Sequence, residues 1–130
     1  MSWWTTVSGM VNVGDSFNTP GRGLSGFHSS PFDVIAKNNN ELLIKSGKSA
    51  ISLTKECFDV VEDFFKNNPG EKLRVASVHS TPALSSSVDE LVRNETGSNL
   101  SRGNYVAAIL EKCSLVIYKM EKRRKYINLI

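Results

Sequence analysis

The most regular stretch of the sequence is residues 54–70, which read TKECFDVVEDFFKNNPG. Between Lys55 and Asn67, apolar side chains recur at spacings of three and four residues, and charged side chains fill the positions between them. This spacing predicts an amphipathic helix, because one face of a helix returns every 3.6 residues. Thr54 is a suitable N-cap, since its hydroxyl can accept a hydrogen bond from a free amide of the first turn. Pro69 ends the helix, because proline cannot continue the hydrogen-bond ladder.

The 53 residues before this helix predict strands and loops. The expected strands cover residues 10–15, 32–35, 41–45 and 49–53. Residues 18–31 are rich in Gly, Ser and Pro, and we expect them to form a loop. Asn38-Asn39-Asn40 and Ser46-Gly47-Lys48 separate the last three strands, and these residue types favour tight turns. Residues 1–53 are therefore predicted to form a small antiparallel β-meander.

The residues after this helix predict a mixture of strands and helices. Lys72 to Val78 is rich in β-branched residues and predicts a strand. Ser87 and Glu90 form a capping-box pattern at the start of a short helix, which ends at Thr96-Gly97. The remaining expected elements are a helix over 102–113, capped by Ser101, and strands over 115–118 and 126–130.

The expected order from residue 54 to residue 130 is helix, strand, helix, turn, helix, strand, basic hairpin and strand. This order resembles that of the winged helix-turn-helix superfamily. The resemblance implies an α+β protein, in which a β-rich lobe of residues 1–53 packs with a winged-helix-like lobe of residues 54–130 as one compact unit. The first lobe resembles the small β-modules attached to helix-turn-helix domains in mobile-element and restriction-associated proteins.

The resemblance also implies that double-stranded DNA is the partner. In winged-helix proteins the second helix of the pair usually enters the major groove, and the hairpin contacts neighbouring phosphates. The helix over 102–113 has few cations, and Glu111 would repel phosphates, which departs from a typical recognition helix. The predicted nucleic-acid-binding residues are Arg102, Asn104, Lys119, Lys122, Arg123, Arg124 and Lys125.

The positive charge of the chain is concentrated near its C-terminal end. The 130 residues carry a net charge of +3, with a pI near 9.0. Residues 119–125 hold five cations and one anion, a net charge of +4, which leaves −1 for the rest of the chain. Clustered cations repel one another, and a phosphate partner would relieve this repulsion. The alternative is a solvated hairpin tip, where Lys and Arg protect a strand edge against aggregation.

Other motifs favour structural rather than chemical roles. Gly21 to Gly26 matches the dinucleotide-binding fingerprint but lacks the flanking strand and helix, so we expect a loop. Ser46 to Ser49 resembles the end of a phosphate-binding loop, but a turn between strands fits better. The two histidines and two cysteines have no metal-site spacing, and no nucleophile motif occurs. We therefore expect no enzyme activity, no metal and no cofactor.

Two further expectations concern the compartment and the aromatic residues. No apolar run approaches the ~20 residues that cross a bilayer, and no secretory signal is evident, which predicts a cytoplasmic protein with reduced Cys57 and Cys113. Five aromatic residues near the N-terminus are expected to fill a core rather than to line a pocket for a base or a methylated cation. They are Trp3, Trp4, Phe17, Phe27 and Phe32. The alternative to DNA binding is a protein-interaction module that forms a homodimer.

Overall fold

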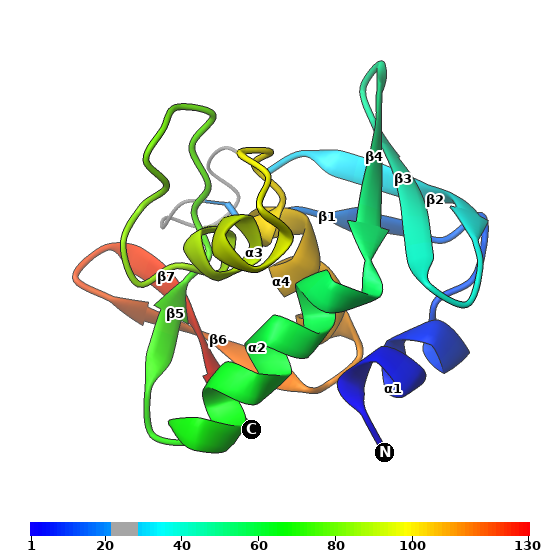
Figure 1. The fold of residues 1–130 in the computed structure, drawn as a ribbon. Coiled ribbons are helices and arrows are strands. Elements are labelled where there is room, and N and C mark those ends of the chain that lie inside the picture. The colour runs from blue at the N-terminus through cyan, green and yellow to red at the C-terminus, as the bar shows by residue number, and fades with distance from the viewer. Residues whose placement is uncertain (22–28) are drawn as a thin grey trace.

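The computed structural model describes residues 1–21 and 29–130 and shows an α+β protein, as the sequence predicts (Figure 1). The helices are α1 (Trp3–Met10), α2 (Lys55–Asn67), α3 (Val88–Thr96) and α4 (Gly103–Lys112). The strands are β1 (Ser16–Asn18), β2 (Pro31–Lys37), β3 (Glu41–Ser46), β4 (Ser49–Thr54), β5 (Lys72–Arg74), β6 (Val116–Glu121) and β7 (Arg124–Leu129). Most of the glycine-rich loop predicted from Gly21, together with Phe27 and His28, lies outside the described residues.

The first sheet confirms the predicted antiparallel meander. Its strand order is β1-β2-β3-β4, and each pair of neighbours is antiparallel. The turn between β3 and β4 places Gly47 at a φ of +60°, in the left-handed region that glycine adopts without a Cβ clash. Ser46 to Ser49 is therefore a hairpin turn, with strands on both sides of it.

A strand over residues 10–15 was predicted wrongly, and the helix α1 was missed. Ser2 caps α1, because its Oγ accepts a hydrogen bond from the Thr5 amide at 3.1 Å. The ring of Trp4 packs against that of Phe58 in α2, with 5.6 Å between the centroids. A helix of eight residues is marginal alone, so tertiary packing on α2 supplies its stability. The periodicity of so short a segment gave no usable signal.

The second sheet has the strand order β5-β7-β6 and is antiparallel. Strand β5 is shorter than predicted and ends at Arg74, after which the chain leaves the sheet. The hairpin strands β6 and β7 are instead extended into the basic stretch, so that Lys119 and Arg124 lie in strands and only Lys122 and Arg123 form the turn. The cations thus lie along a regular hairpin rather than in an irregular loop.

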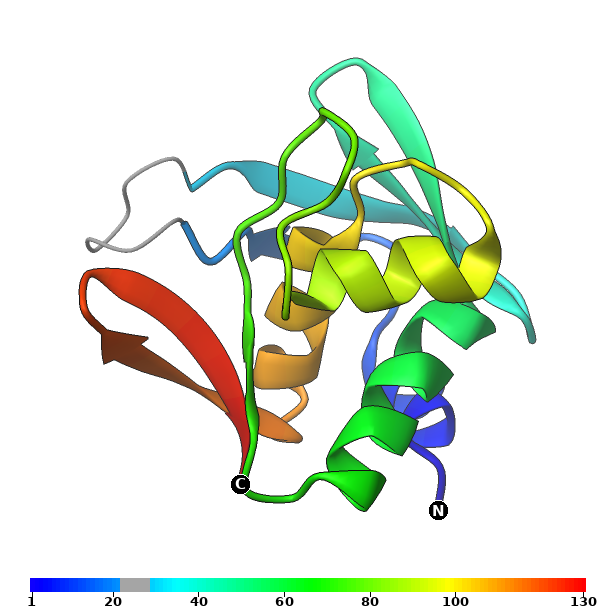
Figure 2. The ribbon, with the colours of Figure 1, turned by 60° about the vertical axis from the view of Figure 1, so that its left-hand side comes forward.

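One hydrophobic core joins the N-terminal sheet to the helices. It contains Phe32, Ile44 and Leu53 from the sheet together with Phe58 from α2 and Ile109 from α4, all at most 1% exposed. Helix α4 lies between the two sheets in both views of the ribbon (Figures 1 and 2). One continuous core therefore extends across the predicted boundary between the lobes of residues 1–53 and 54–130.

The N-terminal aromatic residues that the structure describes belong to this core, as expected. Trp4, Phe17 and Phe32 are buried, and the partly buried Trp3 packs against Phe65 with 6.2 Å between ring centroids.

The two cysteines are buried and free, which confirms the prediction of reduced thiols. Burial raises the pKa of the Cys113 thiol, because a low-dielectric environment disfavours the thiolate. Both residues act as small apolar side chains.

Candidate functional site

The N-terminus of α4 is held by a carboxylate from α3. The Oδ1 of Asp89 accepts hydrogen bonds from the amides of Arg102 (3.0 Å) and Gly103 (3.2 Å). The Oδ2 of Asp89 lies 2.9 Å from Nη2 of Arg93, and both side chains are almost completely buried. The predicted cap, Ser101, is thus replaced by Asp89, whose negative charge also suits the positive end of the helix dipole.

Arg102 is part of the interior rather than of an exposed surface. Its side chain is 5% exposed, and Nη1 donates to the Ser52 carbonyl at 3.1 Å while Nη2 donates to Oγ1 of Thr96 at 2.7 Å. The guanidinium therefore connects β4 to the end of α3. The base contact predicted for Arg102 requires an exposed side chain, and the structure does not provide one.

The N-terminal sheet covers the beginning of α4. The ring of Tyr105 meets that of Phe32 edge-on, with 5.1 Å between the centroids, and its hydroxyl lies 3.2 Å from Oγ of Ser46. The helix predicted to enter a DNA groove is therefore packed against β2 and β3. Because Arg102 is buried, it does not share an exposed surface with the hairpin cations.

The predicted hairpin cations remain together on one element, which we call the basic hairpin (residues 116–129). Four of them are exposed: Lys119, Lys122, Arg123 and Arg124. Glu121 pairs with Arg124 in the strand register, so Lys122 and Arg123 form a two-residue turn. Their φ angles are +51° and +66°, in the left-handed region that long side chains rarely adopt.

Strand register extends the positive surface from the tip onto the outer face of the second sheet. Cross-strand neighbours share a face, and Tyr126 pairs with Arg74 on one side and with Lys119 on the other. The Nζ of Lys72 lies 4.6 Å from the centre of the Tyr126 ring and forms an ion pair with Glu121. Sequence reasoning missed Lys72 and Arg74 because β5 lies about fifty residues before β7.

Lys125 lies on the opposite face of the hairpin and has partners within the protein. Its Nζ donates to the Pro20 carbonyl at 2.6 Å and lies 5.2 Å from the centre of the Tyr118 ring. Its carbonyl accepts a hydrogen bond from the Val75 amide at 3.2 Å. Lys125 therefore ties the basic hairpin to residues 19–21 and to the end of β5, rather than pointing freely into solvent.

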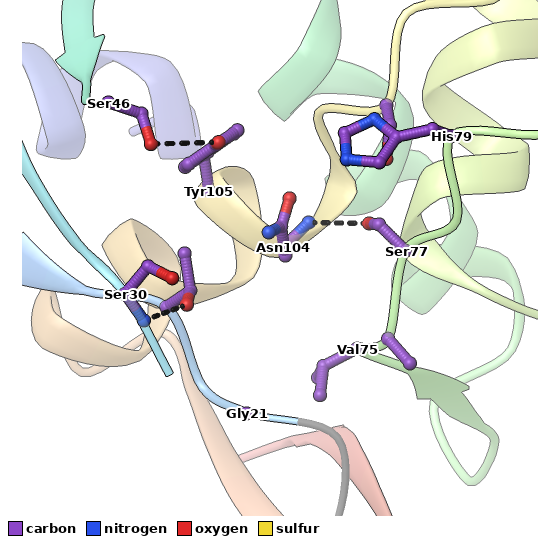
Figure 3. A pocket seen from close by; sticks show the side chains of 11 residues that line it. Gly21, Ser30, Ser46, Val75, Ser77, His79, Asn104 and Tyr105 are labelled. Carbon is purple, nitrogen blue, oxygen red and sulfur yellow. Dashed lines mark hydrogen bonds between the residues drawn. The ribbon is translucent and has the colours of Figure 1, made fainter. Parts of the chain in front are cut away.

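Those same segments form one wall of a polar pocket (Figure 3). The cavity has a volume of about 240 Å³, and α4 contributes Asn104 and Tyr105 to it. The lining residues are Thr19, Gly21, Ser30, Ser46, Val75, Ala76, Ser77, His79, Ser101, Asn104 and Tyr105. Among the residues that the structure describes, the lining therefore includes hydroxyls, an amide and an imidazole but no carboxylate and no Lys or Arg side chain.

Asn104, predicted to contact a base, lies in the middle of this pocket between Tyr105 and Ser77 (Figure 3). Its backbone amide donates to Oγ of Ser77 at 3.1 Å, which fixes the first turn of α4 against the segment that follows β5. Its side-chain Oδ1 is buried and has no hydrogen-bond partner within the described part of the chain. The structure thus separates Asn104 in the pocket from the exposed cations of the basic hairpin.

No protein-family model matches the chain, and no similar protein was found among curated proteins or among solved structures. Within residues 1–21 and 29–130, no helix has the length and apolar character needed to span a membrane. The same residues contain no cluster of three or more His, Cys, Asp or Glu side chains that could hold a metal ion.

Proposed function

We propose that this protein is a DNA-binding accessory or regulatory protein, whose basic hairpin contacts the phosphates of a duplex. Helix α2, strand β5, helices α3 and α4, and the basic hairpin follow one another in the order of a winged helix. We further propose that this unit is a winged helix in which the N-terminal sheet covers the second helix of the pair. Such a protein would contact DNA through its wing, which here is the basic hairpin. An association with a mobile element stays a prediction.

The observation that carries this proposal is the turn at Lys122 and Arg123. Two-residue hairpin turns with positive φ at both positions favour Asn-Gly, because longer residues are strained there. Left-handed backbone costs a non-glycine residue about 1–2 kcal/mol, so two long cations at this turn lower the stability of the hairpin. The turn also exposes both charges to solvent. Contact with phosphates would explain why the turn has Lys122 and Arg123, although Asn-Gly would make the hairpin more stable.

This geometry supports contact with the DNA backbone rather than with particular base sequences. Phosphate contacts position a protein on a duplex, whereas specificity needs side chains at base edges. Arg102 is buried, and Asn104 lies inside the pocket, so α4 presents neither side chain to an intact groove. We therefore expect affinities for unrelated paired duplexes to agree within a few fold.

The experiment replaces Lys119, Lys122, Arg123 and Arg124 together with Gln and measures duplex affinity as a function of salt. Four phosphate contacts give a log–log salt slope of about −3.6 for the wild type, and the variant should bring the slope toward zero. The control carries Lys66→Gln and Lys112→Gln, two exposed cations away from the basic hairpin. An unchanged slope in the fourfold variant would contradict the proposal.

A homodimer is the second candidate, and the exposed apolar side chains of the basic hairpin favour it. Ile117 is 38% exposed and Met120 is 49% exposed, and both lie on β6, which is an edge strand of its sheet. An unpaired strand edge can accept another strand. Sedimentation velocity and retention on heparin separate the two functions: a stable dimer that heparin does not retain would favour the interaction module.

A further inference from the structure

We propose that the polar pocket at the start of α4 receives a single unpaired nucleobase of the bound DNA, and that Asn104 recognises it. This inference rests on the proposed function, because the basic hairpin would supply the affinity for the backbone. Adenine is the base that fits best, since the amide of Asn can pair with adenine through one donor and one acceptor.

The size of the pocket fits one ring system. Pockets for drug-sized ligands usually measure about 300–1,000 Å³, and this cavity of about 240 Å³ is smaller. Its walls come from segments far apart in the sequence: residues 19–21 and 30, the end of β3, residues 75–79 and the start of α4. A stacked base pair cannot enter such a cavity. A base would have to leave the helical stack, which costs least where it is already unpaired.

The chemistry of the pocket fits an uncharged ligand with several hydrogen-bonding groups. The lining residues offer hydroxyls, an amide and an imidazole, and none of them carries a carboxylate or a permanent positive charge. An ionic ligand would therefore have no countercharge among the described lining residues. The ring of Tyr105, fixed edge-on against Phe32, adds an aromatic surface to one wall.

The side chain of Asn104 has a buried hydrogen-bond acceptor without a partner among the described residues. A buried acceptor without a partner costs about 1–3 kcal/mol, so most native structures avoid one. Its Oδ1 is such an acceptor, and the hydrogen bond from its backbone amide to Ser77 fixes the Asn104 backbone at the start of α4. Oδ1 is closed off in this structure, so the side-chain amide has to rotate toward the pocket. The exocyclic amino group of adenine would then donate to Oδ1, and a ring nitrogen would accept from Nδ2. A hydrogen-bonding base thus satisfies the atom that the protein leaves unpaired.

The pocket also lies beside the proposed phosphate contacts. Lys125 connects the two, since its Nζ binds the Pro20 carbonyl next to the pocket residues Thr19 and Gly21. Arg123 is two residues from Lys125, or about 7 Å along an extended strand. Figure 2 shows the hairpin tip on the same side of the molecule as the segment ending at Gly21. The proposed phosphate contacts at the tip and the pocket are therefore connected through Lys125 and Pro20.

The test compares three duplexes that differ at one position: fully paired, with one bulged adenine, and with one bulged abasic site. The abasic bulge has the same backbone flexibility but no base. We expect wild-type protein to bind the bulged adenine about tenfold more tightly than either control, a factor within the range of one bidentate base contact. Asn104→Leu should lose this preference while keeping the affinity for the paired duplex and its salt slope.

The outcomes distinguish the inference from the proposed function. Equal affinity for the adenine and abasic bulges in wild-type protein overturns the inference and leaves the proposed function standing. Failure to bind any duplex overturns both. Should adenosine monophosphate alone bind as tightly as the bulged duplex, the pocket serves a free nucleotide and the inference is again overturned. These comparisons use wild-type protein, so they stand even if Asn104→Leu does not fold; Asn104→Ser then replaces it.

Discussion

At the scale of single residues, polar groups at the start of α4 determine what the helix can do. Asp89 uses one oxygen to cap α4 and the other to pair with Arg93, while Arg102 joins two elements in the interior. Removing one partner from a buried ion pair leaves an uncompensated charge, which destabilises a protein by about 3–5 kcal/mol. These residues fix the start of α4, where the pocket residue Asn104 lies.

Gly103 permits the close approach of α3 to α4, and its replacement tests that contact. A Cβ at this position would lie 2.3 Å from the backbone N of Asp89 and 2.5 Å from its Cα. Because both atoms belong to the backbone, Gly103→Ala should lower the free energy of unfolding by about 3 kcal/mol. Chemical denaturation measures the change.

Gly9 provides the matched control for that substitution. A Cβ there meets no atom within 4 Å, and Gly9 lies in the helix α1. Gly9→Ala should therefore raise the free energy of unfolding by up to about 1 kcal/mol, since alanine favours helices. Similar losses in both variants would refute the proposed close packing at Gly103.

At the scale of elements, sequence patterns predicted those parts that local periodicity or turn chemistry defines. The helix over Lys55–Asn67 was predicted with its observed bounds, and the meander and both later helices were correct to within a few residues. Gly97 ends α3 with a φ of +65°, as predicted. These features depend on residues close together in the sequence.

Features that depend on distant residues were not predictable in the same way. Thr54 occupies the N-cap position of α2, but its hydroxyl makes no capping hydrogen bond. Helix α1 depends on packing against α2, and the cap of α4 comes from Asp89 in another helix. The pocket could not be predicted either, because five separate parts of the chain contribute its walls. No local sequence pattern indicates contacts between residues so far apart in the chain.

The basic hairpin carries a titrating group that tests the packing of its inner face. Burial, with a smaller contribution from the charge of Glu111, raises the pKa of Tyr118 well above its usual value. The folded state then holds the phenol proton more tightly than the unfolded state does. Stability is complete below the unfolded pKa of about 10 and falls as the pH rises above it, by up to roughly 1.4 kcal/mol per pH unit.

The measurement is urea denaturation of the wild type and of Tyr118→Phe between pH 8 and pH 11. The wild type should lose more stability than the variant over this range, because the variant lacks the titrating phenol. Tyr105 and Tyr126 are present in both proteins and affect them alike. Equal losses of unfolding free energy in the wild type and the variant would contradict the burial of the Tyr118 side chain.

At the scale of the whole molecule, two groups of predicted nucleic-acid-binding residues lie in different places. The exposed cations follow the outer face and the tip of the second sheet, whereas Asn104 lies in a pocket between the sheets. Lys125 joins them through its contacts with Pro20 and Val75. In the proposed function, the exposed cations would contact the DNA backbone, and the pocket would receive a single base.

The most direct test of the central claim, that the hairpin tip is built for phosphate contact, is the double variant Lys122→Asn with Arg123→Gly. Asn-Gly suits the left-handed turn, so the free energy of unfolding should rise by about 1–2 kcal/mol. Duplex affinity should fall, and the log–log salt slope should become shallower by about 1.8, because two phosphate contacts are lost. A more stable protein that binds DNA with unchanged affinity and unchanged slope would contradict the account.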